Sequence, residues 1–140
     1  MVKVPATPQG IVLIGEGINV NVTLLFAQES YEQVAEAYIA VLEAYASRRG
    51  DLSRVASVAS FFISRIDTAI DNLAAARLQA GTNAHETSLL RGLTGNVAIA
   101  NAKLTYQRYR ELFSGRRWQA LASKGPQTQR LLWAAPVTAT

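Results

Sequence analysis

The chain has 140 residues, of which 49% are hydrophobic and 17% are charged, so it suits a single folded domain over residues 1–140. It has no cysteine and one histidine, His85, which excludes a disulfide scaffold, a thiol nucleophile and a thiolate metal site, and we expect no metal. Its net charge of +4 comes from basic residues that are scattered and not interleaved with aromatic residues, which argues against a nucleic-acid partner.

No apolar run reaches the length of about 18 residues that a membrane-spanning helix needs. The first residues also lack the basic flank and apolar run of a signal peptide. The sequence therefore predicts a soluble cytoplasmic protein with no membrane partner.

The first part of the chain predicts two strands joined by a short helix. Residues 2–4 form a short apolar strand that Pro5 ends, because proline cannot donate to a strand ladder. Residues 6–17 leave room for a helix of two turns at most. Residues 18–26 then alternate, which predicts a strand with two different faces. One face holds Ile18, Val20, Val22 and Leu24, and the other holds Asn19, Asn21, Thr23 and Leu25.

The strongest helical pattern in the chain follows. Ser30 and Gln33 have the spacing of a capping box, which predicts a helix start at this point. Apolar and aromatic side chains then recur at helical spacing on one face: Tyr31, Val34, Ala35, Tyr38, Val41, Leu42 and Tyr45. We interpret the tyrosines as part of a core-facing stripe, and Gly50 as the C′ residue that ends the helix.

The second half of the chain predicts two further strands separated by helices. Residues 55–63 are mostly apolar, as in a strand buried on both faces. We expect helices at residues 67–80, 96–113 and 118–123, a polar loop at 81–95 that contains His85, and a last strand at 130–134 limited by Pro136. Strands that alternate with helices predict parallel pairing, so the fold class is α/β, either half of an eight-stranded β/α barrel or a small open sheet.

Polar side chains lie near the carboxyl ends of these strands, where parallel β/α barrels carry their chemistry. The first strand offers Lys3 and the second offers Asn21 and Thr23. The third offers Ser60 and Phe62, with Arg65 just beyond it.

Together these residue types suit a phosphorylated carbonyl compound. Apolar neighbours would favour the neutral amine of Lys3, which would condense with the carbonyl to an iminium. Thr23 would position a water, Asn21 would bind substrate hydroxyls, and Arg65 would hold a phosphate.

Each residue also has a structural explanation. Lys3 would be a surface lysine on a frayed terminus, and Asn21 would cap a strand end. Ser60 would fill a small gap, and Arg65 would pair with Asp67. The sequence pattern alone leaves both interpretations open.

The sequence of these segments resembles that of transaldolases, in particular the bacterial branch that also occurs fused to glucose-6-phosphate isomerase. The similar segments are VKVPAT at 2–7, GINVNVTLLF at 17–26, VASVASFFISRID at 55–67, AIANAKL at 98–104 and LFSGRRW at 112–118. The resemblance extends over essentially all 140 residues.

The resemblance implies a TIM-type β/α barrel in which this chain corresponds to the fourth to seventh strands. It implies transfer of a dihydroxyacetone unit through a lysine Schiff base, in the pentose phosphate pathway and with no cofactor. The substrates would be fructose 6-phosphate, sedoheptulose 7-phosphate, erythrose 4-phosphate and glyceraldehyde 3-phosphate. Lys3 would be the Schiff-base lysine, Thr23 and Asn21 would contact the catalytic water and substrate, and Ser60, Phe62 and Arg65 would complete the substrate site, with Arg65 at the phosphate.

The chain also departs from the family pattern. Whole transaldolases have three earlier strands that carry an aspartate, an asparagine and a glutamate for proton transfer and water activation, and these would precede Met1. The helix after Lys3 looks about one turn short, and Ala135 stands where the family has a phosphate-binding serine. We therefore expect activity in this truncated chain to be impaired or absent. The alternative is a non-catalytic half-barrel that forms a homodimer or complements another barrel fragment through its end strands.

Overall fold

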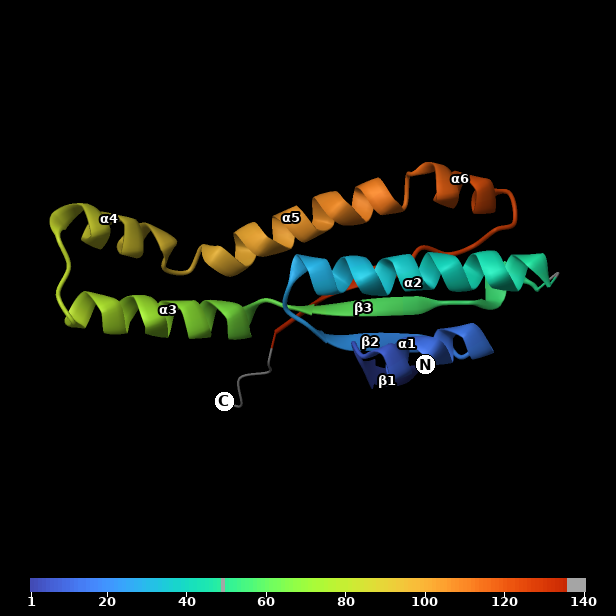
Figure 1. Ribbon diagram of the computed structural model, residues 1–140, viewed down its shortest axis with the longest axis horizontal. Helices are drawn as coiled ribbons and strands as arrows, with labels where there is room; N and C mark the ends of the chain where they lie inside the picture. The colour runs from blue at the N-terminus through green and yellow to red at the C-terminus, as the bar shows by residue number, and fades with distance from the viewer. Residues whose placement is uncertain (49, 136–140) are drawn as a thin grey trace.

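The computed structural model describes residues 1–48 and 50–135, which form an α/β fold around one parallel sheet (Figure 1). Its strands are β1 (Val2–Pro5), β2 (Val20–Leu25), β3 (Ser57–Phe62) and β4 (Arg130–Ala134), and they lie in the order β1-β2-β3-β4. All three neighbouring pairs are parallel, as the alternation of strands and helices predicted. Within the described residues β1 and β4 are the end strands, whereas Pro136 lies outside them.

Helices connect the strands and cover one side of the sheet. The first crossover contains α1 (Pro8–Val12) and the 3₁₀ helix η1 (Leu13–Glu16), which fits the predicted limit of two turns. The second contains α2 (Gln28–Ser47) and the 3₁₀ helix η2 (Leu52–Arg54). The third contains four helices: α3 (Ser64–Gln79), α4 (Ala84–Leu93), α5 (Val97–Leu112) and α6 (Arg116–Ala122).

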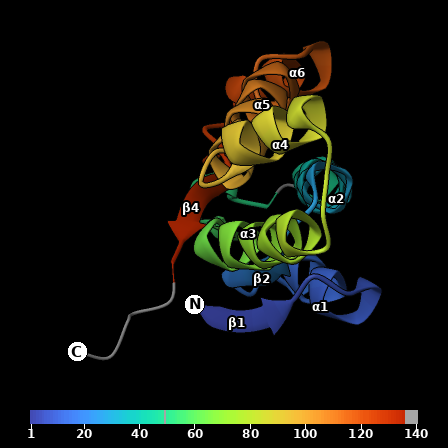
Figure 2. The same ribbon diagram turned by 90° about the vertical axis from the view of Figure 1, so that its left-hand side faces the viewer.

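The third crossover leaves the sheet before it returns. Figure 1 shows α3 and α4 projecting beyond the carboxyl ends of the strands, while α5 and α6 run back beside α2. Viewed from the end in Figure 2, α1, α2, α5 and α6 lie on the same side of the sheet. The carboxyl ends of β1, β2 and β3 therefore lie near the base of the α3–α4 hairpin.

The hydrophobic core lies between the sheet and α2. Side chains from alternate strand positions are buried there, including Val4, Val20, Val22, Ala59 and Phe61. The stripe predicted on α2 is confirmed: Tyr31, Val34, Ala35, Tyr38 and Leu42 are buried, and Val41 and Tyr45 pack partly against them. The strand side chains between these positions point to the opposite face, which we call the inner face.

The predicted start of α2 at a capping box is wrong. The N-cap is Ala27, whose carbonyl accepts a hydrogen bond from the Tyr31 N–H at 3.1 Å, so the first turn forms before Ser30 is reached. At the other end the helix stops at Ser47, and the Gly50 N–H donates to the Tyr45 carbonyl at 3.0 Å. Gly50 is therefore one position later than predicted, in the C″ place of a Schellman-type ending.

The predicted loop at residues 81–95 is also wrong, because most of it forms α4. Asn83 caps this helix with a side-chain oxygen that accepts a hydrogen bond from the Glu86 N–H at 2.8 Å. His85 is exposed in the first turn of α4 rather than in a loop. Helix α3 likewise begins at Ser64, three residues before its predicted start.

The alternation predicted for the second strand fails at its end. Leu24 has a left-handed φ of 66°, and the pairing register with β3 shifts between Val22 and Leu25. As a result Leu25 is fully buried and Leu24 is 48% exposed, the reverse of the predicted faces. A bulge inserts one residue and moves every following side chain to the other face.

Candidate active site

Lys3 and Asn21 lie side by side on the inner face of the sheet. They are register partners on β1 and β2, and the flanking Val4 and Val22 point into the core. The Lys3 side chain is exposed, because β1 is an end strand of the described sheet. The enclosure by apolar neighbours that we expected for this amine is therefore not formed by this segment alone.

Asn21 and Ser60 are joined by a direct hydrogen bond. The Ser60 hydroxyl donates to Asn21 Oδ1 at 2.7 Å, and Ser60 is only 2% exposed. Ser60 thus orients the Asn21 amide and does more than fill a gap. Thr23 is half-buried two residues further along β2, next to the bulge.

Phe62 and Arg65 meet where β3 passes into α3. The guanidinium carbon of Arg65 lies 4.9 Å from the centre of the Phe62 ring, which is a cation–π contact. Arg65 is exposed, and within the described residues no carboxylate oxygen lies within 4.0 Å of it. The alternative pairing with Asp67 is not formed, because Asp67 Oδ1 accepts a hydrogen bond from the Ala98 N–H at 3.0 Å.

The six predicted residues therefore come from three adjacent strands and the first turn of α3. One further residue joins them that the sequence pattern did not single out. The ring of Phe26 stacks on Phe62 with a centroid distance of 5.0 Å and an interplanar angle of 17°. The sequence pattern could not single out Phe26, because continued alternation would place it on the core face with Val20 and Val22.

The inner face of this sheet is basic. It carries Lys3 on β1 and Arg130 on β4, which occupy one register row with Asn21 and Val58 between them. None of the ten carboxylates in the sequence lies on a strand. The described strands thus carry an amine and a guanidinium but no carboxylate.

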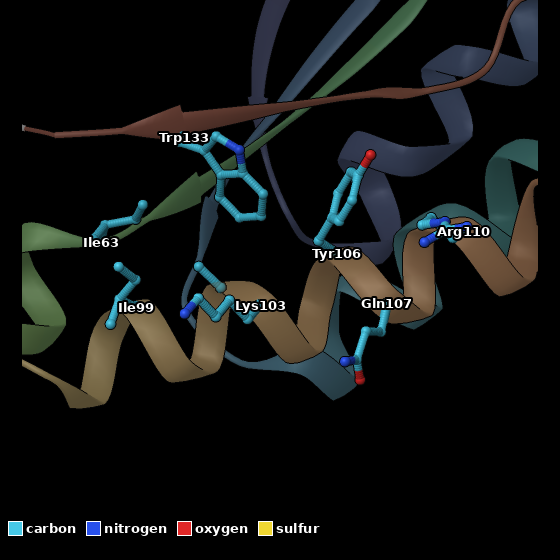
Figure 3. Close-up of a pocket in the computed structure, with 8 residues that line it drawn as sticks. Ile63, Ile99, Lys103, Tyr106, Gln107, Arg110 and Trp133 are labelled. Carbon is cyan, nitrogen blue, oxygen red and sulfur yellow. The ribbon is translucent and has the colours of Figure 1, made fainter.

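A cavity of about 570 Å³ lies elsewhere, on the helix side of β4 (Figure 3). Its lining residues come from the residue between β3 and α3, from β4 and from one side of α5: Ile63, Ile99, Ala102, Lys103, Tyr106, Gln107, Arg110 and Trp133. Trp133 is the register partner of the core residue Phe61, so this cavity faces away from Lys3 and Asn21. It is a groove beside an end strand, distinct from the candidate site residues on the inner face.

Comparison with known proteins relates this arrangement to a family. The sequence model described as Transaldolase/Fructose-6-phosphate aldolase matches residues 1–136. The chain belongs to the transaldolase/fructose-6-phosphate aldolase family. Its α/β sheet is consistent with part of the TIM-type barrel of this family.

Individual transaldolases are similar over nearly the whole chain. The chain is 50% identical over 142 residues to a transaldolase of Trichodesmium erythraeum, and the match covers 99% of this chain and 37% of that protein. It is 48% identical to a protein named transaldolase 2 from a Nostoc species, with 99% and 38% coverage, and 47% identical to a transaldolase of Saccharopolyspora erythraea, with 96% and 35%. The chain thus spans little more than a third of the length of these relatives.

Proposed function

We propose that the chain carries the Schiff-base segment of a transaldolase, which transfers a dihydroxyacetone unit between sugar phosphates of the pentose phosphate pathway. The observation that carries this proposal is the register pairing of Lys3 with Asn21, which places a primary amine beside an amide oriented by Ser60. The family match over residues 1–136 supports the assignment of this amine as the nucleophile. We also propose a cytoplasmic location, as for a metabolic enzyme. None of the helices that the structure describes is long and apolar enough to cross a membrane.

The chemistry begins with addition of the Lys3 amine to the ketose carbonyl carbon. Loss of the carbonyl oxygen as water gives an iminium, which withdraws electrons from the bond that an aldol cleavage breaks. Asn21 would hold a substrate hydroxyl, and Thr23 would hold the water that takes part in proton transfer. Phe62 and Arg65 would bind the far end of the substrate, where the guanidinium would pair with the phosphate.

Iminium formation and carbon–carbon cleavage make different demands on this chain. Cleavage needs a base for the substrate hydroxyl, and such general acid–base help commonly contributes about 10²- to 10⁴-fold to a rate. No carboxylate lies on the described strands. We therefore propose that the 140-residue chain forms the iminium but cleaves and transfers poorly.

Borohydride trapping tests this proposal. The chain is incubated with fructose 6-phosphate, reduced with borohydride and weighed intact by mass spectrometry. We expect a mass gain equal to one reduced hexose phosphate, with little of the smaller adduct that a cleaved three-carbon unit would leave. The adduct should disappear in Lys3→Ala and persist in the matched control Lys103→Ala, because Lys103 lies on α5 beside the groove. The absence of any adduct in the wild-type chain would refute the proposal.

The second candidate function is a non-catalytic half-barrel that associates through its end strands. The Val2 N–H donates to the Asn19 carbonyl and the Ala6 N–H to the Thr23 carbonyl, so alternate residues of β1 bond to β2 and Lys3 presents its backbone groups to the open edge. Such an edge is a template for another strand.

Sedimentation equilibrium at increasing concentrations tests this second candidate. We expect reversible self-association that weakens in Lys3→Pro, which removes the edge N–H, and that persists in Lys3→Ala, which keeps it. A wild-type chain that stays monomeric at every concentration would exclude the homodimer and leave only complementation by another fragment.

A further inference from the structure

Leu24 adopts a backbone conformation that is unusual for its residue type. With a φ of 66° it is the one residue other than glycine, among those the structure describes, that has a positive φ. A left-handed conformation is unfavourable for a leucine and persists only where the surroundings impose it. Leu24 directly follows Thr23, so this strain lies at the edge of the candidate site.

The strain at Leu24 decides on which face the end of β2 presents its side chains. Val22 points into the core and Thr23 to the inner face, and regular alternation would return Leu24 and Phe26 to the core side. The bulge instead buries Leu25 completely and leaves Leu24 48% exposed. Phe26 consequently lies on the same side as Phe62, and the two rings stack at 5.0 Å.

The stack continues to Arg65. The centre of the Phe62 ring lies 5.0 Å from the centre of the Phe26 ring and 4.9 Å from the guanidinium carbon of Arg65. The backbone of Phe26 is held as well, because Asn101 Nδ2 on α5 donates to its carbonyl at 2.9 Å. Because the Phe26 ring fixes the Phe62 ring, the Arg65 guanidinium that rests on Phe62 has a preferred position. The N–H groups of this guanidinium stay available to an anion.

We infer that Phe26 is a positioning residue that acts through Phe62 to hold the Arg65 guanidinium ready for a phosphate monoester, and that the Leu24 bulge serves to bring Phe26 to that place. This inference rests on the proposed function, since it deepens the role given there to Arg65. Neither Phe26 nor Leu24 touches the reacting carbonyl in this account. Their effect is on binding and not on the chemistry at Lys3.

Titration with inorganic phosphate, observed through the arginine side-chain signals in NMR spectra of the isotope-labelled chain, tests the inference. We expect the Arg65 signals to shift with phosphate. Phe26→Leu should weaken phosphate binding about three- to fivefold, because Phe62 would lose the ring that fixes its cation–π contact with Arg65, and such a contact contributes up to about fivefold at an exposed site. Phe26→Tyr, which keeps an aromatic ring, should restore binding to within about twofold of the wild-type chain. Leu24→Gly should keep it too, because glycine adopts a positive φ readily.

The matched control is Tyr106→Leu. Tyr106 is a half-exposed aromatic residue that stacks on Tyr109 with a centroid distance of 5.7 Å, and its replacement should leave phosphate binding unchanged. Unaltered phosphate affinity in a folded Phe26→Leu chain would overturn the inference, as would a wild-type titration in which the Arg65 signals do not move. If Lys3 still forms its borohydride adduct in that case, this inference has failed while the Schiff-base proposal stands; the lack of both signals would refute both.

Discussion

Tyr38 carries a hydroxyl into the centre of the core. Its side chain is fully buried, and the hydroxyl donates to the Gln127 carbonyl at 2.7 Å, which ties α2 to the segment before β4. Burial disfavours the phenolate and raises the pKa of Tyr38 to about 12, from 10.0 for an exposed tyrosine. Burial likewise raises the pKa of Tyr31.

These shifts predict a loss of stability in strong base. As the pH rises above 10, the unfolded chain loses the Tyr38 proton before the folded chain does, so the folded state binds more protons and the free energy of unfolding falls. The contribution of the Tyr38 proton to the free energy of unfolding is fully present below pH 10. It is lost between pH 10 and 12 and amounts to about 3 kcal/mol for a pKa shift of this size.

Urea denaturation between pH 9 and about pH 12 measures this effect. In Tyr38→Phe the free energy of unfolding should fall less steeply with pH than in the wild-type chain, although Tyr31 still contributes to the fall. In Tyr106→Phe, which changes an exposed tyrosine, it should fall as in the wild type. An equally steep decline in Tyr38→Phe would contradict the assignment.

At the residue scale the sequence predicted which polar side chains share one face of the sheet, but it placed Lys3 and Asn21 too close to the carboxyl ends of their strands. Lys3, Asn21 and Ser60 could be assigned to strands because the apolar alternation around them is regular, and the parallel pairing brings Lys3 beside Asn21, which Ser60 hydrogen-bonds. Lys3 and Asn21 each occupy the second position of their strand and not its carboxyl end. Phe26 could not be found in this way, because nothing in the sequence GINVNVTLLF marks the bulge at Leu24. The exposure of Lys3 could not be predicted either, because it depends on which strands flank β1 and the local sequence does not specify them.

At the element scale the first crossover is closely packed against the strand that precedes it. Gly10 in α1 lies directly against the end of β1, where an added Cβ would overlap the Pro5 carbonyl oxygen and come within 3.2 Å of Val4 Cβ. This close approach lets the short helix return to the sheet with few residues.

Gly10→Ala should therefore destabilise the chain by about 1–3 kcal/mol, the usual cost of overpacking. Gly15→Ala is the matched control, because a Cβ there would meet Val41 at an ordinary 3.8 Å. Chemical denaturation of both variants compares them, and equal stabilities would contradict the close contact.

Helix α5 is capped from another helix. Asp67 Oδ1 accepts from the Ala98 N–H and Asp71 Oδ1 from the Gly95 N–H, both at 3.0 Å, so two carboxylates of α3 bind the N-terminal end of α5. The Asp67 contact satisfies one of the free N–H groups in the first turn of α5, whereas the Asp71 contact holds the residue just before the N-cap. The negative charge of both carboxylates favours this end of the helix.

Asp67→Ala should lower the free energy of unfolding by about 1 kcal/mol, the typical value of a lost cap. Asp67→Asn, which keeps an acceptor oxygen, should lose less. A thermal unfolding series would measure both, and an Asp67→Ala chain as stable as the wild type would count against the cap.

Element prediction succeeded where hydrophobic spacing was strong and failed where capping decided. The α2 stripe was clear from its spacing, but its start depends on the Ala27 carbonyl, which has no side-chain signal. Helix α4 buries none of its residues, so it lacks the apolar face on which periodicity depends. Its start could have been found from Asn83 and Glu86, which have capping-box spacing.

At the scale of the whole molecule, the chain is a four-stranded parallel sheet with helices on one side and two end strands. The α/β class followed from the alternation of strands and helices, and the structure confirms it. The position of β3 between β2 and β4 also fits its predicted burial on both faces, since five of its six residues are buried. The overhang of α3 and α4 could not be predicted, because it depends on where a helix turns back and not on its own pattern.

The central claim is that Lys3, among the three lysines of the chain, is the amine that condenses with a ketose phosphate. Peptide mapping by tandem mass spectrometry after borohydride trapping with fructose 6-phosphate tests it most directly. We predict that the reduced sugar phosphate is found on the N-terminal peptide at Lys3, with Lys103 and Lys124 unmodified. A label spread evenly over the three lysines, or one confined to Lys103 or Lys124, would contradict it.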